Sequence, residues 1–208
     1  MVKVKICGIT KIEDAIIAAE LGAWAIGFIF YPKSPRYISP EKAQEISQEI
    51  KKYATKTIGV FVNETAEKIN EAAKIAQLDY VQLHGKETAF ECNQLEIPFI
   101  KNIRSPDEIN DYNKAFAFLV DASDTQVWGG TGTLSDWDLA KKIKAQNKPL
   151  ILSGGLSLDN IEKALKEVKP DFIDLSSGLE TAPGEKDHII MRKFFEKIKD
   201  LKESKINE

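Results

Sequence analysis

The sequence has little cysteine, histidine or methionine, with two residues of each among its 208. Cys7 and Cys92 are too few for a disulfide framework, and neither has the paired spacing that binds zinc. The most apolar stretch, AWAIGFIFY at 23–31, is far shorter than the ~20 residues of a membrane helix. These features argue against a disulfide-rich secreted module, a zinc protein and a membrane-spanning protein.

Charge of one sign is also scarce, because the formal net charge is only −3. We therefore expect no binding to nucleic acid or to an anionic membrane surface. The chain begins with strand-forming residues and shows no basic segment followed by an apolar one, so we expect no signal peptide. Low cysteine content favours a reducing compartment, and we expect a cytoplasmic protein.

The length and a hydrophobic fraction of 43% suit one domain, spanning 1–208, with a sizeable core. Short β-branched or aromatic runs alternate along it with charged segments of helical spacing. We predict eight strands, at 2–7, 23–30, 57–62, 79–84, 98–103, 116–121, 149–153 and 171–176.

Helix signals lie between these runs. Residues 11–21 carry one apolar face and end before a glycine, and Ser39 has the features of an N-cap followed by proline. We expect two further helices to begin at Asn63 and Ser157. The segment 105–115, before the sixth strand, is polar and lacks an apolar stripe, so the helix there is weak or missing.

Eight strand–helix units predict an α/β protein with a parallel sheet, and we favour a closed (β/α)₈ TIM barrel of one domain. An open, doubly wound sheet is the alternative. A barrel strand is buried on both faces, so the wholly apolar face of the first strand should meet the helices. Lys5 and Cys7 then point inward, as do Gln82, His84 and Asp121, and the C-terminal ends of barrel strands form active sites.

Two glycine-rich turns follow the seventh and eighth strands, SGGLS at 153–157 and SSGLE at 176–180. Glycine lets backbone N–H groups approach an anion closely, and barrels often hold phosphate in these two loops. The other interpretation is two ordinary tight turns. We predict a phosphate site formed by Gly154, Gly155, Ser176, Ser177 and Gly178.

Cys7 and Asp121 are the candidates for acid–base chemistry. A thiol acts as a base only where its thiolate is favoured, and Lys5 lies two residues back on the same face. We expect cationic surroundings to lower the pKa of Cys7 and an apolar setting to raise that of Asp121. The alternatives are a buried small hydrophobe for Cys7 and a helix cap for Asp121. Cys92, in a polar helical stretch, we interpret as structural.

Three further features complete the predicted site. Arg36, in the proline-stiffened loop FYPKSPRYISP, is either a carboxylate ligand or a solvated arginine. His84 either lines the pocket or is a satisfied polar residue. The segment WGGTGT at 128–133 resembles a lid more than a phosphate cradle.

Taken together, these motifs resemble those of the phosphoribosylanthranilate isomerase family. The resemblance covers nearly the whole chain in order, through KICGIT (5–10), FIFYPKSPRYIS (28–39), IGVFVN (58–63), VQLHG (81–85), LVD (119–121), WGGTGT (128–133), LSGGLS (152–157), IDLSSGLE (173–180) and APGEKD (182–187). Two departures are Thr133, where the family commonly has lysine, and Leu179, where it commonly has valine.

The resemblance implies an isomerase of tryptophan biosynthesis that performs an Amadori rearrangement of a phosphorylated aminoaldose. It implies Cys7 as general base, Asp121 as general acid, Arg36 as carboxylate ligand and the two glycine turns as the phosphate site. The iminium formed on ring opening is itself the electron sink, so we expect no metal and no cofactor. We expect a monomer or a homodimer.

Two alternatives remain at this stage. One is a neighbouring phosphosugar barrel enzyme, such as indole-glycerol-phosphate synthase or a histidine-pathway isomerase, and Cys7 at the end of the first strand counts against both. The other is a non-catalytic protein that binds a phosphorylated ligand, which has no need for Cys7 to face Asp121.

Overall fold

Eight parallel strands close into a barrel in the computed structural model, which describes residues 2–121 and 137–204. Each strand pairs with the next along the chain, and the eighth returns to the first, with Lys5 opposite Asp174. The predicted TIM barrel is confirmed, and the open sheet is wrong. The strands are β1 (Lys3–Cys7), β2 (Ala25–Ile29), β3 (Lys56–Phe61), β4 (Tyr80–Leu83), β5 (Phe99–Asn102), β6 (Ala117–Val120), β7 (Leu150–Leu152) and β8 (Phe172–Leu175).

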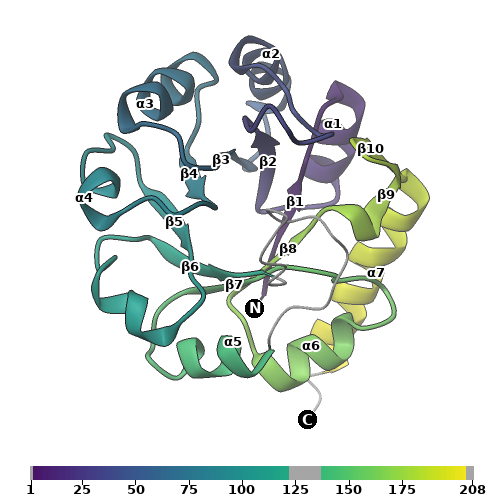
Figure 1. Ribbon diagram of the computed structural model, residues 1–208. Coiled ribbons are helices and arrows are strands. Elements are labelled where there is room, and N and C mark those ends of the chain that lie inside the picture. The colour runs from purple at the N-terminus through teal and green to yellow at the C-terminus, as the bar shows by residue number, and fades with distance from the viewer. Residues whose placement is uncertain (1, 122–136, 205–208) are drawn as a thin grey trace.

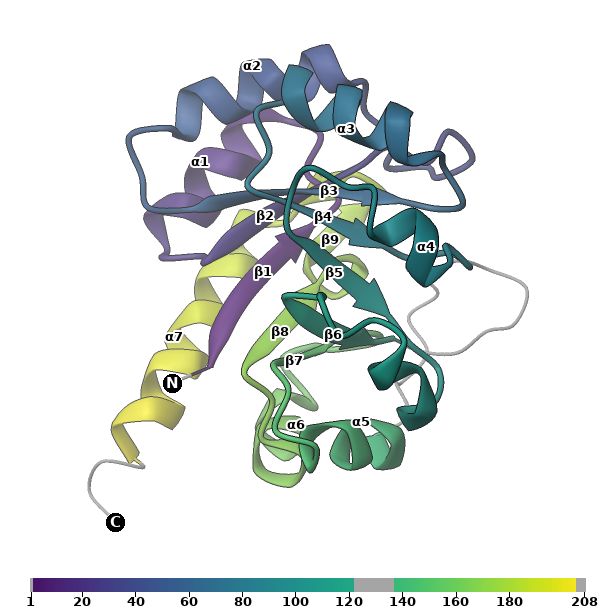
Figure 2. The same cartoon turned by 90° about the vertical axis from the view of Figure 1, so that its left-hand side faces the viewer.

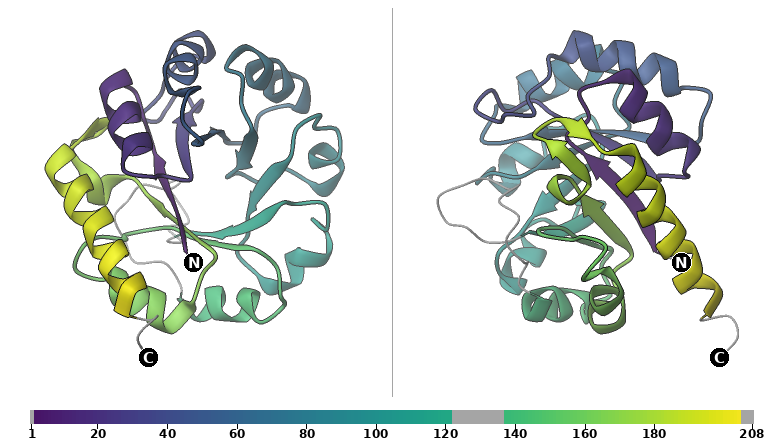
Figure 3. Two further views of the ribbon diagram at one scale, coloured as in Figure 1. Left: turned by 180° about the vertical axis from the view of Figure 1, so that it is seen from behind. Right: turned by 90° about the vertical axis from the view of Figure 1, so that its right-hand side faces the viewer.

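Helices surround this barrel in a ring (Figure 1). The last of them, α7, is the longest described helix and lies beside α1 and β1, as the side views show (Figures 2 and 3). No helix within the described residues is long and apolar enough to cross a membrane. The helices are α1 (Ile12–Glu20), α2 (Pro40–Ile50), α3 (Ala66–Ile75), α4 (Ala89–Cys92), α5 (Trp137–Lys144), α6 (Ile161–Val168) and α7 (His188–Ser204).

Short elements complete the connections. The weak helix expected at 105–115 is a single 3₁₀ helix, η1 (Pro106–Asn110), capped by the Ser105 hydroxyl. After β8 the chain forms another 3₁₀ turn, η2 (Ser177–Leu179), and then an antiparallel hairpin of β9 (Glu180–Ala182) and β10 (Glu185–Lys186). This hairpin returns the chain to the end of β1, where Lys186 of β10 contacts Cys7.

The predicted helix starts are right in two cases and wrong in two. The helix predicted over 11–21 is α1, which begins after Lys11. Ser39 caps α2, its hydroxyl accepting from the Lys42 N–H. The third helix begins after Thr65 rather than Asn63, because Asn63 adopts a left-handed φ of 52° and its amide oxygen accepts from the Lys86 N–H. The helix predicted from Ser157 begins after Asn160. Ser and Asn suit turns as well as caps, so their presence alone does not fix the start.

The barrel interior changes from apolar to polar along its axis. At the N-terminal ends of the strands, aromatic rings pack together, with Trp24 4.4 Å from Phe172 and Tyr80 4.7 Å from Phe116 between ring centroids. Above them lies a buried aliphatic layer, made by Ala25, Ile58, Ile100, Ala117, Leu119 and Ile151. Lys5 lies within this layer. The other polar inward-facing side chains lie above it, at the C-terminal ends of the strands, where barrel enzymes place their chemistry.

Candidate active site

Five of the predicted site residues line one cavity. Cys7, Arg36, His84 and Asp121, together with Ser176 of the predicted phosphate site, border a space of about 70 Å³ at the C-terminal ends of the strands. Cys7 ends β1, and Asp121 follows β6 directly, so the closure of the barrel brings a sulfur and a carboxyl from distant parts of the chain to the same pocket. The cavity is completed by Ile29, Tyr31, Ser34, Val60, Val62, Gln82, Ser153 and Asp174.

Two successive polar contacts connect side chains of the β4 segment to Asp121. Gln82 Nε2 lies 3.2 Å from His84 Nδ1, and His84 Nε2 lies 3.2 Å from Asp121 Oδ2. Because an amide nitrogen only donates, Nδ1 of the ring accepts and Nε2 carries the hydrogen toward the carboxylate. His84 therefore both lines the pocket, as predicted, and orients Asp121.

The β1 side of the pocket contains a buried ion pair. Lys5 Nζ donates to Asp174 Oδ2 at 2.7 Å. Burial raises the pKa of the Cys7 thiol above its ordinary value, although Lys5 acts to lower it. The expectation that cationic surroundings leave Cys7 with a lowered pKa is therefore wrong, because desolvation in the closed barrel outweighs the lysine.

Three buried polar atoms at the cavity have no hydrogen-bond partner among the described residues: Gln82 Oε1, Asp174 Oδ1 and Ser176 Oγ. An unsatisfied buried polar group costs about 1–3 kcal/mol. Their residues all line the space beside Cys7. Such a group of acceptors suits a ligand that brings hydroxyl donors, as an open-chain sugar does.

The two glycine turns form a second, adjoining cavity of about 30 Å³. All five residues predicted for phosphate line it, namely Gly154, Gly155, Ser176, Ser177 and Gly178. Gly154 and Gly155 have φ of 87° and 63°, in the region that favours glycine. A Cβ on Gly178 would come within 2.2 Å of the Leu156 carbonyl oxygen, so only glycine lets the two turns approach this closely. Backbone N–H groups in such a concave turn suit an anion.

Arg36 is held in place rather than solvated. Its Nε and Nη2 donate to Glu180 at 2.9 and 2.6 Å, and Glu180 also accepts from Lys186 Nζ at 2.6 Å. Burial alone would raise the pKa of Glu180, but Arg36 and Lys186 hold it below its ordinary value. Lys186 Nζ donates in addition to the Cys7 carbonyl oxygen, which ties the end of β1 to the hairpin. Within the described residues, Arg36 Nη1 makes no hydrogen bond and so remains for a ligand.

A second buried ion pair fixes the turn that follows His84. Lys101 Nζ donates to the Gly85 carbonyl oxygen at 2.8 Å and to Glu87 Oε2 at 2.9 Å. Glu87 Oε1 accepts in turn from the N–H groups of Gly85 and Asn63. The backbone N–H and the carbonyl oxygen of Gly85 are therefore both hydrogen-bonded, which fixes the position of the preceding residue, His84.

Sequence reasoning missed Asp174, Glu180, Lys186 and the Glu87–Lys101 pair. Glu180 and Lys186 stand inside SSGLE and APGEKD, so the signal was a charged residue within each motif. Cys92 lies in a buried apolar cluster outside both cavities, and burial raises its pKa to about 11, which agrees with a structural role. The proposed lid at 128–133, including Thr133, lies outside the described residues.

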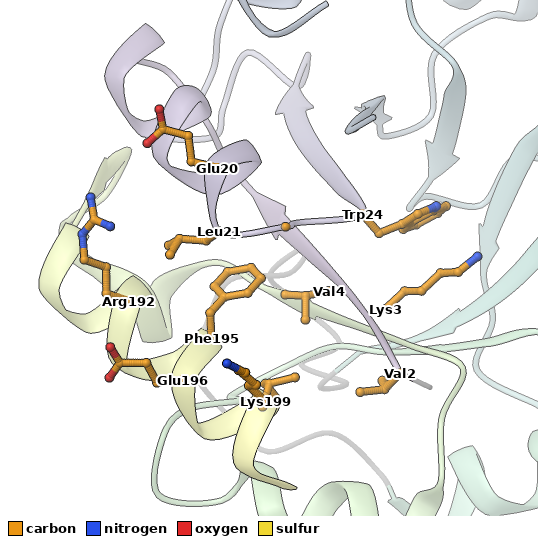
Figure 4. Close-up of a pocket in the computed structure, with 12 residues that line it drawn as sticks. Val2, Lys3, Val4, Glu20, Leu21, Trp24, Arg192, Phe195, Glu196 and Lys199 are labelled. Atoms are coloured by element: carbon orange, nitrogen blue, oxygen red, sulfur yellow. The ribbon is translucent and has the colours of Figure 1, made fainter. Parts of the chain in front are cut away.

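A larger cavity, of about 650 Å³, lies at the opposite end of β1, between α1 and α7 (Figure 4). Lys3, Arg192 and Lys199 border it together with Glu20 and Glu196. Its charges are of mixed sign, and it contains none of the predicted site residues. Size alone therefore does not mark the site, because the predicted site residues gather at the C-terminal ends of the strands.

The family model that describes N-(5′-phosphoribosyl)anthranilate isomerases matches residues 4–197 of the chain. The chain is 44% identical over 208 residues to the N-(5′-phosphoribosyl)anthranilate isomerase of Thermotoga petrophila, covering 97% of this chain and 100% of that protein.

Solved structures give the same result. The phosphoribosyl anthranilate isomerase of Thermotoga maritima superposes with a TM-score of 0.85 at 41% identity, covering 96% of this chain and 100% of that one. A phosphoribosyl anthranilate isomerase in complex with reduced 1-(o-carboxyphenylamino)-1-deoxyribulose 5-phosphate superposes with a TM-score of 0.81 at 40% identity, covering 94% and 97% of the two chains.

Proposed function

The chain belongs to the N-(5′-phosphoribosyl)anthranilate isomerase family, and from that premise we propose which of its residues carry out the reaction. It is an isomerase of tryptophan biosynthesis. It converts N-(5′-phosphoribosyl)anthranilate to 1-(o-carboxyphenylamino)-1-deoxyribulose 5-phosphate, an Amadori rearrangement. The observation that carries the assignment of roles is that Cys7 and Asp121 share one cavity that adjoins the glycine turns.

The substrate has three parts that match the chemistry of the two cavities. Arg36, whose Nη1 makes no hydrogen bond within the described residues, is the ligand of the anthranilate carboxylate. The turns at Gly154–Gly155 and Ser176–Gly178 hold the phosphate. The ribose then lies between them, where Asp121, Asp174 and Ser176 are shared by both cavities.

The first step opens the sugar ring. Asp121, protonated, donates its proton to the furanose ring oxygen while the bond from that oxygen to C1′ breaks. The lone pair of the anthranilate nitrogen forms a double bond to C1′, which leaves an iminium cation. His84 holds the carboxyl in position for this transfer.

The second step moves a proton from carbon. The iminium makes the C2′ proton acidic, and the Cys7 thiolate removes it. The electron pair of the C2′–H bond becomes the C1′–C2′ double bond, and the iminium nitrogen becomes neutral. The resulting enolamine tautomerises to the ketone product. A well-positioned group contributes about 10²–10⁴-fold to each proton transfer. Since the iminium accepts the electron pair, these steps require no cofactor.

Turnover of N-(5′-phosphoribosyl)anthranilate, followed by the loss of its fluorescence, tests the assignment. We expect Arg36→Ala to raise KM with a smaller change in kcat, because it removes a binding contact rather than a proton carrier. No turnover of this substrate, with turnover of another phosphosugar or binding of phosphorylated ligands alone, would reject the proposed function. A cytoplasmic location, a monomeric or homodimeric state and the absence of nucleic-acid binding stay predictions.

A further inference from the structure

Lys5 is a buried cation that the proposed mechanism does not use. Its side chain is 0% exposed inside the barrel. Isoleucines occupy the interior of the other odd-numbered strands, as Ile58, Ile100 and Ile151. Burying an ammonium is costly even when it is paired, and an apolar side chain often serves stability as well. The lysine in this layer therefore calls for a chemical explanation.

The ends of the Lys5 and Cys7 side chains meet above a glycine of the neighbouring strand. A Cβ on Gly27 would lie 2.9 Å from Cys7 Sγ and 3.1 Å from Lys5 Nζ. Neither atom could keep its place beside an alanine there. Gly27 pairs with Cys7 in the sheet, so the bare backbone of β2 provides the space in which ammonium and sulfur approach each other.

Asp174 holds the other side of this ammonium. Its Oδ2 accepts from Lys5 Nζ at 2.7 Å, and β8 places it opposite Lys5 in the sheet. Lys5 is thus fixed between a carboxylate and the sulfur. Burial alone would lower the pKa of Lys5, but Asp174 and Cys7 raise it above its ordinary value, so Lys5 stays charged.

We propose that Lys5 is a positioning residue that supplies the counter-charge for the thiolate of Cys7, with Asp174 setting how much of that charge the sulfur receives. The inference rests on the proposed role of Cys7 as the base. It explains how a thiol in a closed barrel forms an anion when it takes part in proton transfer.

The charged groups around the sulfur shift the pKa of Cys7 in different directions. Lys5 from β1 lowers the pKa of Cys7, Asp174 from β8 raises it, and Lys186 from β10 lowers it. The Lys186 ammonium donates to the Cys7 carbonyl oxygen and to Glu180, so it is committed elsewhere. On the far side, Asp121 and His84 act on Asp174. Removing Lys5 and removing Asp174 must therefore shift the pKa of Cys7 in opposite directions.

The experiment is the pH dependence of Cys7 alkylation by iodoacetamide, measured by mass spectrometry of the peptides. We expect Lys5→Met to raise the midpoint for Cys7 by about 1–3 units, the usual effect of losing an opposite charge within a few ångströms. We expect Asp174→Asn to lower it. Cys92 is an internal control in the Lys5 and Asp174 variants, neither of which removes a charge that acts on it, and its alkylation there must not change.

Lys101→Met is the matched control, because it removes another buried, ion-paired lysine, whose ammonium is bonded to Glu87 and to the Gly85 carbonyl oxygen and is not among the main charges acting on Cys7. Its Cys7 midpoint must equal that of the wild type. If Lys5→Met exposes Cys92 and so reports unfolding, comparison of Asp174→Asn with the double variant Lys5→Met/Asp174→Asn isolates Lys5 without leaving an unpaired acid. The double variant must have the higher midpoint.

Midpoints that shift in the same direction, or that do not shift, overturn the inference. The proposed function fails separately, through a Cys7→Ser variant that keeps its isomerase kcat. Unshifted midpoints together with an inactive Cys7→Ser variant would leave Cys7 as the base and reject Lys5 as its counter-charge.

Discussion

Gly178→Ala tests whether the two glycine turns hold the substrate phosphate. The added Cβ would stand 2.2 Å from the Leu156 carbonyl oxygen, whereas an ordinary contact is 3.4–4 Å. The oxygen belongs to the backbone and cannot rotate away. The turns after β7 and β8 must therefore separate by about 1 Å, and overpacking of this kind costs about 1–3 kcal/mol of stability.

The expected effect on binding follows from this displacement. An anion held by N–H groups from both turns loses its alignment with at least one of them. A hydrogen bond to a charged group is worth about 1.5–3 kcal/mol, and 1.36 kcal/mol corresponds to a factor of ten. We expect KM for N-(5′-phosphoribosyl)anthranilate to rise about 10- to 100-fold, with a much smaller fall in kcat.

Steady-state kinetics of the purified variant measure both constants, and inhibition by inorganic phosphate should weaken in parallel. Gly22→Ala is the control: Gly22 has φ of +87° and no atom within 4 Å of an added Cβ, so alanine strains the backbone without a clash. It lies before β2, away from the turns, and should lower stability while leaving KM unchanged. A folded Gly178→Ala variant with the KM of the wild type would refute phosphate binding at these turns.

Three further predictions concern the supports of the site and the fold. Lys101→Met should lower kcat about tenfold or more, because it releases the Gly85 carbonyl oxygen that fixes the turn after His84; an unchanged kcat in steady-state assays would contradict this support. The pKa of Glu180 is lowered in the folded state, so Glu180 stabilises the fold at any pH above about 4.5, its pKa in the unfolded chain. This contribution is lost as the pH falls through the pKa of the folded state. The free energy of unfolding in urea, measured from neutral to acidic pH, should therefore depend less on pH for Glu180→Gln than for the wild type. An equal dependence on pH in the two proteins would contradict this role of Glu180. Ser39→Ala should cost about 1 kcal/mol of unfolding free energy without affecting activity, and no loss in urea titrations would count against the cap of α2.

The barrel could be predicted because its strands leave a strong local signal. Short apolar runs separated by helical segments indicate a parallel sheet, and alternation along β1 correctly placed Lys5 and Cys7 inside. Most of the site could be predicted for the same reason. Cys7 and Asp121 stand at the ends of predicted strands, and such positions converge at one end of a barrel.

What could not be predicted depends on contacts between distant parts of the chain. Lys5 and Asp174 are 169 residues apart, and Arg36 and Glu180 are 144 apart, so no local pattern joins them. The pKa of Cys7 was predicted with the wrong sign because the nearby lysine is visible in the sequence, whereas the depth of burial is not. Which Asn, Ser or Thr begins a helix likewise depends on what else its side chain can reach.

The most direct test of the account is the kcat of Cys7→Ser and Asp121→Asn in the turnover of N-(5′-phosphoribosyl)anthranilate. If these two groups move the protons of one sugar across one pocket, each variant loses about 10²–10⁴-fold in kcat while KM changes little. A kcat close to that of the wild type in either variant would contradict it.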